Sequence, residues 1–256
     1  MSLFVAEDLS KSFGGVRAVD GVSFSVEAGE VFTIVGPNGA GKSTIFNLIS
    51  RFYDVTTGRI FMDGKEITHV RPDEIIHHGI ARTFQNIELF DHSTVLQNLL
   101  VGRYSRRKSN FIQNLAFLPS VRAEERAHRH AVEEIIEFLD LHAYRDKMIA
   151  GLPYGVRKVV EIGRALACGP KLLLLDEPAS GLSVEETQDV AYWIEDMQKD
   201  MGLTVLMVEH DMSLVSQVST RVLALADGKP IATGTPAEVQ AHPKVIEAYL
   251  GLEDAA

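Results

Sequence analysis

The stretch Gly36-Pro37-Asn38-Gly39-Ala40-Gly41-Lys42-Ser43-Thr44 fits the pattern G-x-x-x-x-G-K-[ST]. The apolar run 31–35 before it predicts a buried strand, and residues 45–49 after it predict the first turns of a helix. Glycines let such a loop point its backbone N–H groups at a phosphate, and the helix N-terminus adds roughly half a positive charge there. This context favours a nucleoside triphosphate site over a glycine-rich turn before an ordinary helix.

The side chains of this loop have separate expected roles. Lys42 is expected to reach the β- and γ-phosphates, and the Ser43 hydroxyl to bind Mg²⁺. The residues expected to hold the nucleotide are Gly36, Pro37, Asn38, Gly39, Ala40, Gly41, Lys42, Ser43 and Thr44.

Two acidic residues end a second apolar strand, predicted within 171–178. In P-loop proteins a strand beside the phosphate loop ends in an acidic residue that helps to hold Mg²⁺, and Asp176 suits that task. Glu177 is placed to accept a proton from the attacking water or to hold that water in line. A strand that merely ends in a polar turn is the alternative, and the phosphate loop upstream disfavours it.

A third apolar run, 204–208, ends in Glu209-His210-Asp211. A lone histidine at a strand end is usually structural or exposed. Here the carboxyl end of the strand is expected to face the same crevice as the phosphate loop, which favours contact between His210 and the γ-phosphate.

Phe13 precedes two glycines in a predicted turn at 11–15, between strands at 3–6 and 22–26. Its ring either plugs the edge of the core or stacks on the nucleotide base, since any aromatic face can cover a base. Local sequence does not choose between these two interpretations.

The remaining chain predicts an α/β fold interrupted by helices. Residues 57–64 predict a turn, a short strand and a turn, and 80–86 predict a strand that ends in polar amides. Strand patterns then disappear, and roughly 87–160 are predicted to form a helical insertion. Near the C-terminus two strands are followed by a helix start at 235–238, with a Thr cap, Pro and Glu.

Composition narrows the classes of protein. The 256 residues carry a formal net charge of −10, which argues against nucleic acid as the main partner. The single cysteine, Cys168, excludes an internal disulfide, and neither a signal peptide nor a spanning helix is expected. The one dense basic run, 103–108, is either a solvated face or a contact with anionic lipid headgroups or a membrane partner.

Together these segments resemble the ATP-binding subunits of ABC transporters over nearly the full length. The family motifs occur in the expected order: Phe13 for the A-loop aromatic, 36–44 for the Walker A, Gln85 for the Q-loop, 152–156 for the signature, 172–177 for the Walker B and its catalytic carboxylate, 180–183 for the D-loop and His210 for the switch histidine. Residues 81–86 and 245–251 look like the branched-chain amino acid importer group, whose members also carry urea, amides and aromatic acids.

The resemblance implies one ABC ATPase domain over 1–256, with ATP and Mg²⁺ as cofactors. A P-loop NTPase (RecA-like) core with an N-terminal antiparallel β subdomain is expected at 1–86 and 161–256, and the helical subdomain at 87–160. Glu177, His210 and Gln85 are the implied catalytic residues. Ser43, Gln85 and Asp176 are the implied Mg²⁺ ligands, and Phe13 and Gly155 the implied nucleotide contacts outside the loop.

The implied partners are transmembrane permease subunits, a second ATPase subunit and, indirectly, an extracytoplasmic solute-binding protein, but no nucleic acid. Such a chain would sit peripherally on the cytoplasmic face of the cell (inner) membrane. Leu89, Phe90 and Val95 are expected to offer apolar contacts to a permease helix.

Two positions depart from the family pattern. The common signature Leu-Ser-Gly-Gly-Gln keeps only Leu152 and Gly155 here, and Ser183 replaces the usual D-loop aspartate. Pro153 lacks a backbone N–H that could contact phosphate. Both changes lie where the resemblance places the partner's nucleotide, which suggests a heterodimer with unequal sites, although a homodimer stays open.

Two other functions share the phosphate loop. A P-loop small-molecule kinase would need an acceptor site and has no use for a signature helix. A non-transport ABC ATPase acting on DNA or ribosomes usually carries tandem units or basic additions, which this acidic single unit lacks.

Overall fold

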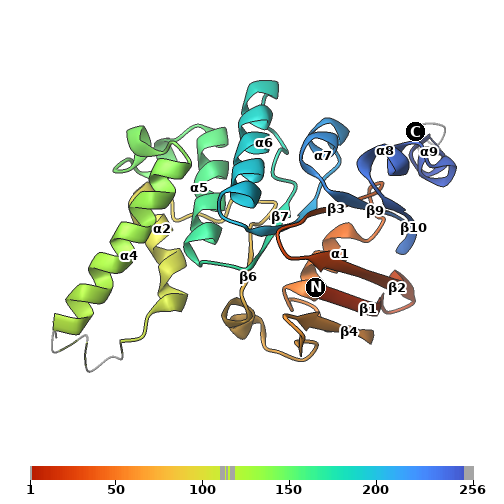
Figure 1. Cartoon of the computed structure of the whole chain (residues 1–256), viewed down its shortest axis with the longest axis horizontal. Coiled ribbons are helices and arrows are strands. Elements are labelled where there is room, and N and C mark those ends of the chain that lie inside the picture. Colours follow the sequence, from red (N-terminus) through yellow and green to blue (C-terminus); the bar gives the residue numbers. More distant parts are fainter. Residues whose placement is uncertain (1, 110–112, 114, 116–118, 251–256) are drawn as a thin grey trace. The chain divides into compact units, whose positions relative to one another are not determined.

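The computed structural model describes residues 2–109, 113, 115 and 119–250, and the chain forms two compact units. The first unit combines 1–82 with 171–256, and the second is 83–170 (Figure 1). The second unit extends beyond the predicted helical range of 87–160 at both ends. The C-terminal boundary of this unit lies after 160 because α5 (Tyr154–Ala167) is one continuous helix that packs on α2 (Val95–Gly102). A boundary at 160 would divide α5.

A six-stranded sheet carries the site in the first unit, with strand order β10-β9-β3-β8-β7-β6. Neighbours from β9 to β6 run parallel, and only β10 is antiparallel to β9. The strands are β3 Val31–Val35, β6 Ile80–Arg82, β7 Leu172–Asp176, β8 Thr204–Val208, β9 Arg221–Ala226 and β10 Lys229–Gly234. Since parallel strands end at the same edge, the segments that follow β3, β7 and β8 meet there.

A second, antiparallel sheet has the order β2-β1-β4-β5. Its strands are β1 Ser2–Phe13, β2 Val16–Glu27, β4 Thr57–Met62 and β5 Lys65–Glu66. The predicted turn at 11–15 is shorter than expected, because β1 and β2 stay paired as far as Phe13 and Val16. The predicted strand at 80–86 is also too long, since β6 pairs with β7 only through Arg82.

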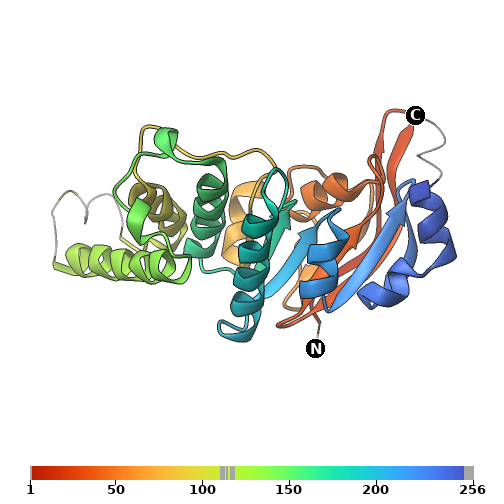
Figure 2. The same ribbon diagram turned by 90° about the horizontal axis from the view of Figure 1, so that it is seen from above.

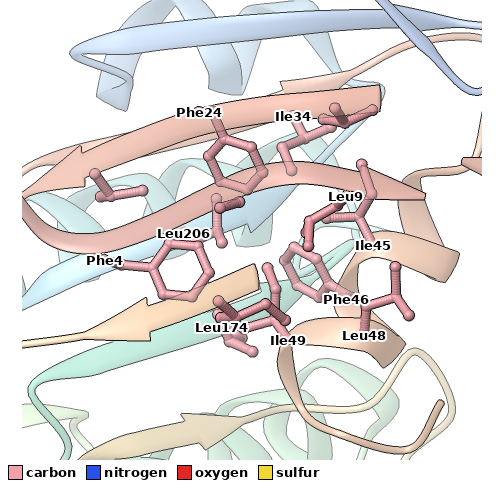
Figure 3. Close-up of a cluster of buried hydrophobic side chains, with 14 of the residues drawn as sticks. Phe4, Leu9, Phe24, Ile34, Ile45, Phe46, Leu48, Ile49, Leu174 and Leu206 are labelled. Carbon is pink, nitrogen blue, oxygen red and sulfur yellow. The ribbon is translucent and has the colours of Figure 1, made fainter. Parts of the chain in front are cut away.

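The main core lies between the two sheets and α1 (Lys42–Ile49). Figure 3 shows this cluster, in which Ile45 and Phe46 of α1 lie beside Leu9 of the antiparallel sheet. Phe4 and Phe24 of the antiparallel sheet and Leu206 of the parallel sheet belong to the same cluster. α1 has its apolar side chains buried in this core, and the phosphate loop is the segment that leads into it. The position of the loop is therefore fixed by packing on both sides of α1.

The remaining helices of this unit are η1 Pro72–His78, α6 Val184–Lys199, α7 Met212–Val218, α8 Pro236–Gln240 and α9 Pro243–Leu250. α6 and α7 lie side by side (Figures 1 and 2). A smaller cluster joins Val35 and Val222 of the sheet to Val215 of α7, Val239 of α8 and Val245 of α9. The predicted helix start at 235 is confirmed: Thr235 and Glu238 form a capping box, with Pro236 at the first helical position.

The second unit is helical in its described residues, with only an isolated bridge between Thr94 and Met148. Its elements are α2, α5, η2 Arg103–Arg106, α4 Pro119–Phe138, η3 His142–Tyr144 and η4 Ile149–Gly151. α2 packs on both α5 and α4. Among all described residues, no helix has the length and apolar character that a membrane crossing requires.

Candidate functional site

The phosphate loop, 36–44, has a backbone that only glycine permits at two of its turns. Gly36 has φ 154° and Gly41 has φ 98°. A Cβ atom at Gly36 would collide with the Leu225 carbonyl oxygen, and one at Gly41 with the Ala18 carbonyl oxygen. The sequence pattern is therefore required by the close approach of neighbouring backbone as well as by a ligand.

Lys42 folds back over this loop. Its ammonium donates to the carbonyl oxygens of Gly36 (2.6 Å) and Pro37 (3.0 Å). Burial lowers the pKa of Lys42, while the negative charges of Glu177, Asp176 and Glu209 oppose that shift. The Lys42 ammonium therefore lies close enough to all three carboxylates to interact with their charges.

The N-terminus of α1 is available to an anion. Gly41 is its N-cap, has a left-handed backbone and makes no side-chain capping hydrogen bond. Ser43 is exposed in the first turn of the helix. The helix therefore begins with backbone N–H groups that no cap side chain occupies, which is the arrangement that binds phosphate in P-loops.

Asp176 ends β7 and is buried against Arg82 at the end of β6. The Arg82 Nη2 donates to Asp176 Oδ2 at 2.7 Å. The Arg82 Nη1 donates to Asn47 Oδ1 (2.7 Å) and Ser50 Oγ (2.8 Å), which belong to the end of α1 and the residue after it. One guanidinium therefore joins the acidic strand end to the helix that follows the phosphate loop.

Glu177 has a strained backbone. Its φ is 48°, a left-handed conformation that costs a residue with a side chain roughly 1–2 kcal/mol. Backbone hydrogen bonds hold the conformation: the Glu177 N–H donates to Val208 O (2.9 Å), and its carbonyl accepts from Ser180 N (3.1 Å). Strain of this kind, kept in place by its surroundings, is often found at functional sites.

Glu209 is fully buried and fixes two segments at once. One of its carboxylate oxygens accepts from Ala179 N (3.0 Å), and the other accepts from His210 N (2.7 Å) and Asp211 N (3.0 Å). The His210 Nδ1 atom lies 4.0 Å from Glu177 Oε2 and 3.6 Å from Glu209 Oε2. The structure thus places the His210 ring beside the Glu177 carboxylate.

A hollow of about 300 Å³ adjoins His210. Residues 179–182, Val184 and the start of α7 line it. Ser183 lies next to this hollow as the N-cap of α6, in a capping box with Glu186: its hydroxyl accepts from Glu186 N at 3.2 Å, and Glu186 Oε2 accepts from Ser183 N at 2.8 Å.

Phe13 is 43% exposed at the end of β1, so it does not plug the core. Its ring meets Tyr53 edge-on, with ring centres 5.2 Å apart, and the Lys11 ammonium lies 5.1 Å from the Phe13 centre. An exposed aromatic pair with a neighbouring cation leaves a surface on which a base can stack.

Gln85 and the signature segment belong to the second unit, and each is described within that unit. Gln85 is exposed in an irregular segment after Thr83. The preceding Phe84 N–H donates to the buried Glu161 of α5 at 3.2 Å, and burial raises the pKa of that carboxyl. The base of the Gln85 segment is therefore attached to the helix that follows the signature.

The signature segment forms the N-terminus of α5. Pro153 is its N-cap, with no side-chain capping hydrogen bond, and Gly155 is the second helical residue. The missing N–H of Pro153 is thus at the cap, and residues 154–156 keep their own N–H groups. Of the apolar contacts expected for a permease helix, Val95 is fully buried and cannot serve, whereas Phe90 is exposed.

Sequence reasoning missed the roles of Arg82 and Glu209. A signal existed for Arg82, an arginine directly after the apolar residues Ile80 and Ala81 of a predicted strand. Glu209 was noticed only as a neighbour of His210. Nothing in the local pattern indicates that its carboxylate reaches Ala179, thirty residues earlier.

Together these features define a nucleotide-binding ATPase of the P-loop class. The family model described as "ABC transporter" matches residues 19–180, well over half of the chain. A second model, "Branched-chain amino acid ATP-binding cassette transporter", matches 225–255. The chain belongs to the ABC transporter family, as an ATP-binding subunit that hydrolyses ATP.

Known proteins match this chain over nearly their full length. The high-affinity branched-chain amino acid transport ATP-binding protein BraF of Pseudomonas aeruginosa is 39% identical over 95% of both chains. LivG of Escherichia coli K12, named for the same transport, is 34% identical over 97% of this chain and 98% of its own. The crystal structure of the ADP conformation of an ABC transporter cassette superposes with a TM-score of 0.86 at 35% identity, covering 98% of this chain and 99% of that one.

Proposed function

We propose that this chain powers an importer for branched-chain amino acids or related small solutes, as a peripheral subunit on the cytoplasmic face of the cell (inner) membrane. The observation that carries the solute class is the likeness to BraF and LivG over the full chain, together with the separate match at 225–255. Family membership removes the small-molecule kinase from consideration. The transport names of these relatives favour transport over a role on DNA or ribosomes.

ATP is held by the phosphate loop, residues 36–44, with Lys42 moving its ammonium from the loop carbonyls to the β- and γ-phosphates. The base stacks on the exposed face of Phe13. On the partner subunit's nucleotide, Gly155 and the uncapped start of α5 contact the γ-phosphate.

Ser43, Asp176 and Gln85 are the proposed Mg²⁺ ligands. The donors fit, because Mg²⁺ prefers hydroxyl, carboxylate and amide oxygens and usually takes only a few from protein, with phosphate and water completing its shell. When bound, Mg²⁺ neutralises charge on the phosphates.

Glu177 holds the attacking water and accepts its proton. His210, in the segment that follows β8, contacts the γ-phosphate. Gln85, which belongs to the second unit, contacts the same phosphate. The supporting geometry is the fixed Glu177 backbone and the buried Glu209 that positions His210. Loss of the γ-phosphate removes the contact made by His210 and releases the ATP-bound dimer.

The proposed partners are transmembrane permease subunits, a second ATPase subunit and, through the permease, an extracytoplasmic solute-binding protein. ATP binds between two ATPase subunits and favours their closed arrangement, and hydrolysis reverses it. Reconstitution with the permease and binding protein in proteoliposomes tests the solute class. Uptake of leucine supports branched-chain amino acids as the solute, and uptake of urea, an amide or an aromatic acid in its place supports a related small solute. Uptake of none of these solutes contradicts the proposal.

The chemistry is tested by Glu177→Gln. The amide keeps the size of the side chain and cannot accept a proton, so we expect kcat for ATP hydrolysis to fall about 10²–10⁴-fold, with ATP affinity nearly unchanged. Glu74→Gln, at an exposed carboxylate on η1, is the matched control and should hydrolyse at the normal rate. Normal turnover by the Glu177→Gln variant would remove the role assigned to Glu177.

A further inference from the structure

A second hollow, of about 610 Å³, lies in the helical unit between α2, η2 and α4. Its lining combines an apolar side, which includes Leu100, Val101 and Tyr104, with a basic side. The arginines of the basic side are Arg103, Arg107, Arg122, Arg126 and Arg129. Glu125 is the only carboxylate among the described lining residues. This concentration of positive charge contrasts with a chain whose formal net charge is −10.

One part of the basic side is rigid. The Arg103 Nη1 donates to Ala167 O (3.0 Å), and its Nε donates to His128 Nδ1 (3.3 Å). Burial and the charge of Arg103 lower the pKa of His128, so the ring is neutral near pH 7. His128 therefore orients Arg103 without adding charge.

The other part is free to bind. Arg122 and Arg126 lie one turn apart on the exposed face of α4, and neither has a carboxylate within ion-pair distance in the described part of the chain. Arg107 has a long pairing with Glu125, at 3.7 Å, and its guanidinium lies 5.7 Å from the centre of the Tyr104 ring. Guanidinium groups present planar pairs of N–H donors that match phosphate oxygens, so the free arginines suit a phosphate group.

The apolar side makes the hollow amphipathic. Tyr104 is 72% exposed and Val101 is 46% exposed, next to the arginines. A small hydrophilic phosphate would leave these side chains in contact with water. A phosphate joined to apolar groups would cover them and gain from the burial of apolar surface.

We infer that this hollow binds an anionic phospholipid, with the headgroup phosphate on Arg122 and Arg126 and the adjoining apolar part of the lipid on Val101 and Tyr104. The proposal gives a function to Arg122, Arg126 and the exposed ring of Tyr104, which ATP hydrolysis does not use. It also commits to a membrane source for the phosphate, because a soluble phosphate leaves the apolar side without a partner.

Co-sedimentation of the full chain with vesicles tests the inference. Wild type should bind phosphatidylglycerol vesicles, bind phosphatidylcholine vesicles far less, and lose binding as salt is raised. Arg122→Gln with Arg126→Gln should weaken binding about 30-fold. Its ATP hydrolysis should stay normal, which also verifies folding.

Two further variants separate the explanations. Lys65→Gln with Lys244→Gln removes the same charge from exposed positions of the first unit, and it should bind vesicles like wild type. Tyr104→Ser keeps the arginines and should weaken binding to phosphatidylglycerol vesicles. Equal losses in the two double variants would show a general charge effect and overturn the proposal. Absence of vesicle binding by wild type, or binding of glycerol phosphate alone, would overturn it as well.

Discussion

Arg82 connects three parts of the site through one guanidinium, and it does so almost out of contact with water. The exposed fractions of the Arg82 and Asp176 side chains are 9% and 4%. The guanidinium also lies over the ring of Phe46, with the Arg82 Cζ atom 5.5 Å from the centre of the ring. The proposed Mg²⁺ ligand Asp176 is thus oriented by a residue that would not touch the nucleotide.

We predict that Arg82→Met lowers the free energy of unfolding by about 3 kcal/mol, because it leaves the buried Asp176 carboxylate without its ion pair. Urea unfolding measures this. Arg71→Met is the matched control, since Arg71 and Asp73 form an exposed pair, and we expect a change of less than about 0.5 kcal/mol. Similar losses in the two variants would show that burial of the Arg82 pair does not matter.

Among the helices and strands, those with a clear local pattern of apolar residues could be predicted from the sequence. The runs 31–35 and 204–208 are apolar apart from one threonine each, and they form the central strands β3 and β8. The ends of β1 and β6 were predicted incorrectly because they depend on which strand lies alongside, which is not a local property. For the same reason, the residues of the phosphate loop could be predicted from their spacing, whereas the contacts of Arg82 and Glu209 could not.

Ser183 shows how one residue of an element can have two interpretations. As a replacement for the usual D-loop aspartate it suggested a weakened site, but in the structure it caps α6 together with Glu186. Serine and aspartate cap helices about equally well. The stability of α6 therefore does not distinguish the two residues.

We predict that Ser183→Ala lowers the free energy of unfolding by about 1 kcal/mol, whereas Ser183→Asp leaves it nearly unchanged. Thermal or urea unfolding measures both. Thr235→Ala removes the corresponding cap from α8 and serves as the reference for the loss of a capping box. A destabilised Ser183→Asp variant would contradict the capping explanation.

For the whole molecule, the departures at Pro153 and Ser183 bear on assembly. The N–H groups of 154–156 remain at the start of α5, but the signature hydroxyl of the common family sequence is absent. Removal of one preorganised donor to developing charge costs about 10²-fold in rate or more. A dimer of two identical chains would carry this deficit at both sites.

We therefore predict that the purified chain alone hydrolyses ATP slowly and remains monomeric with ATP, and that a second ATPase subunit with a complete signature raises turnover at one site. Light scattering with and without ATP, together with steady-state hydrolysis, tests this. An ATP-dependent homodimer with full, symmetric turnover would show that two unequal sites are not needed.

The left-handed backbone of Glu177 has a consequence for protein engineering. Glycine adopts φ 48° without the steric cost that a side chain incurs, so position 177 is one where replacement would raise stability. A screen that rewarded only heat resistance would therefore favour glycine there and discard the carboxylate. Directed evolution of this chain toward durability has to include selection for hydrolysis, because at this position the two aims oppose each other.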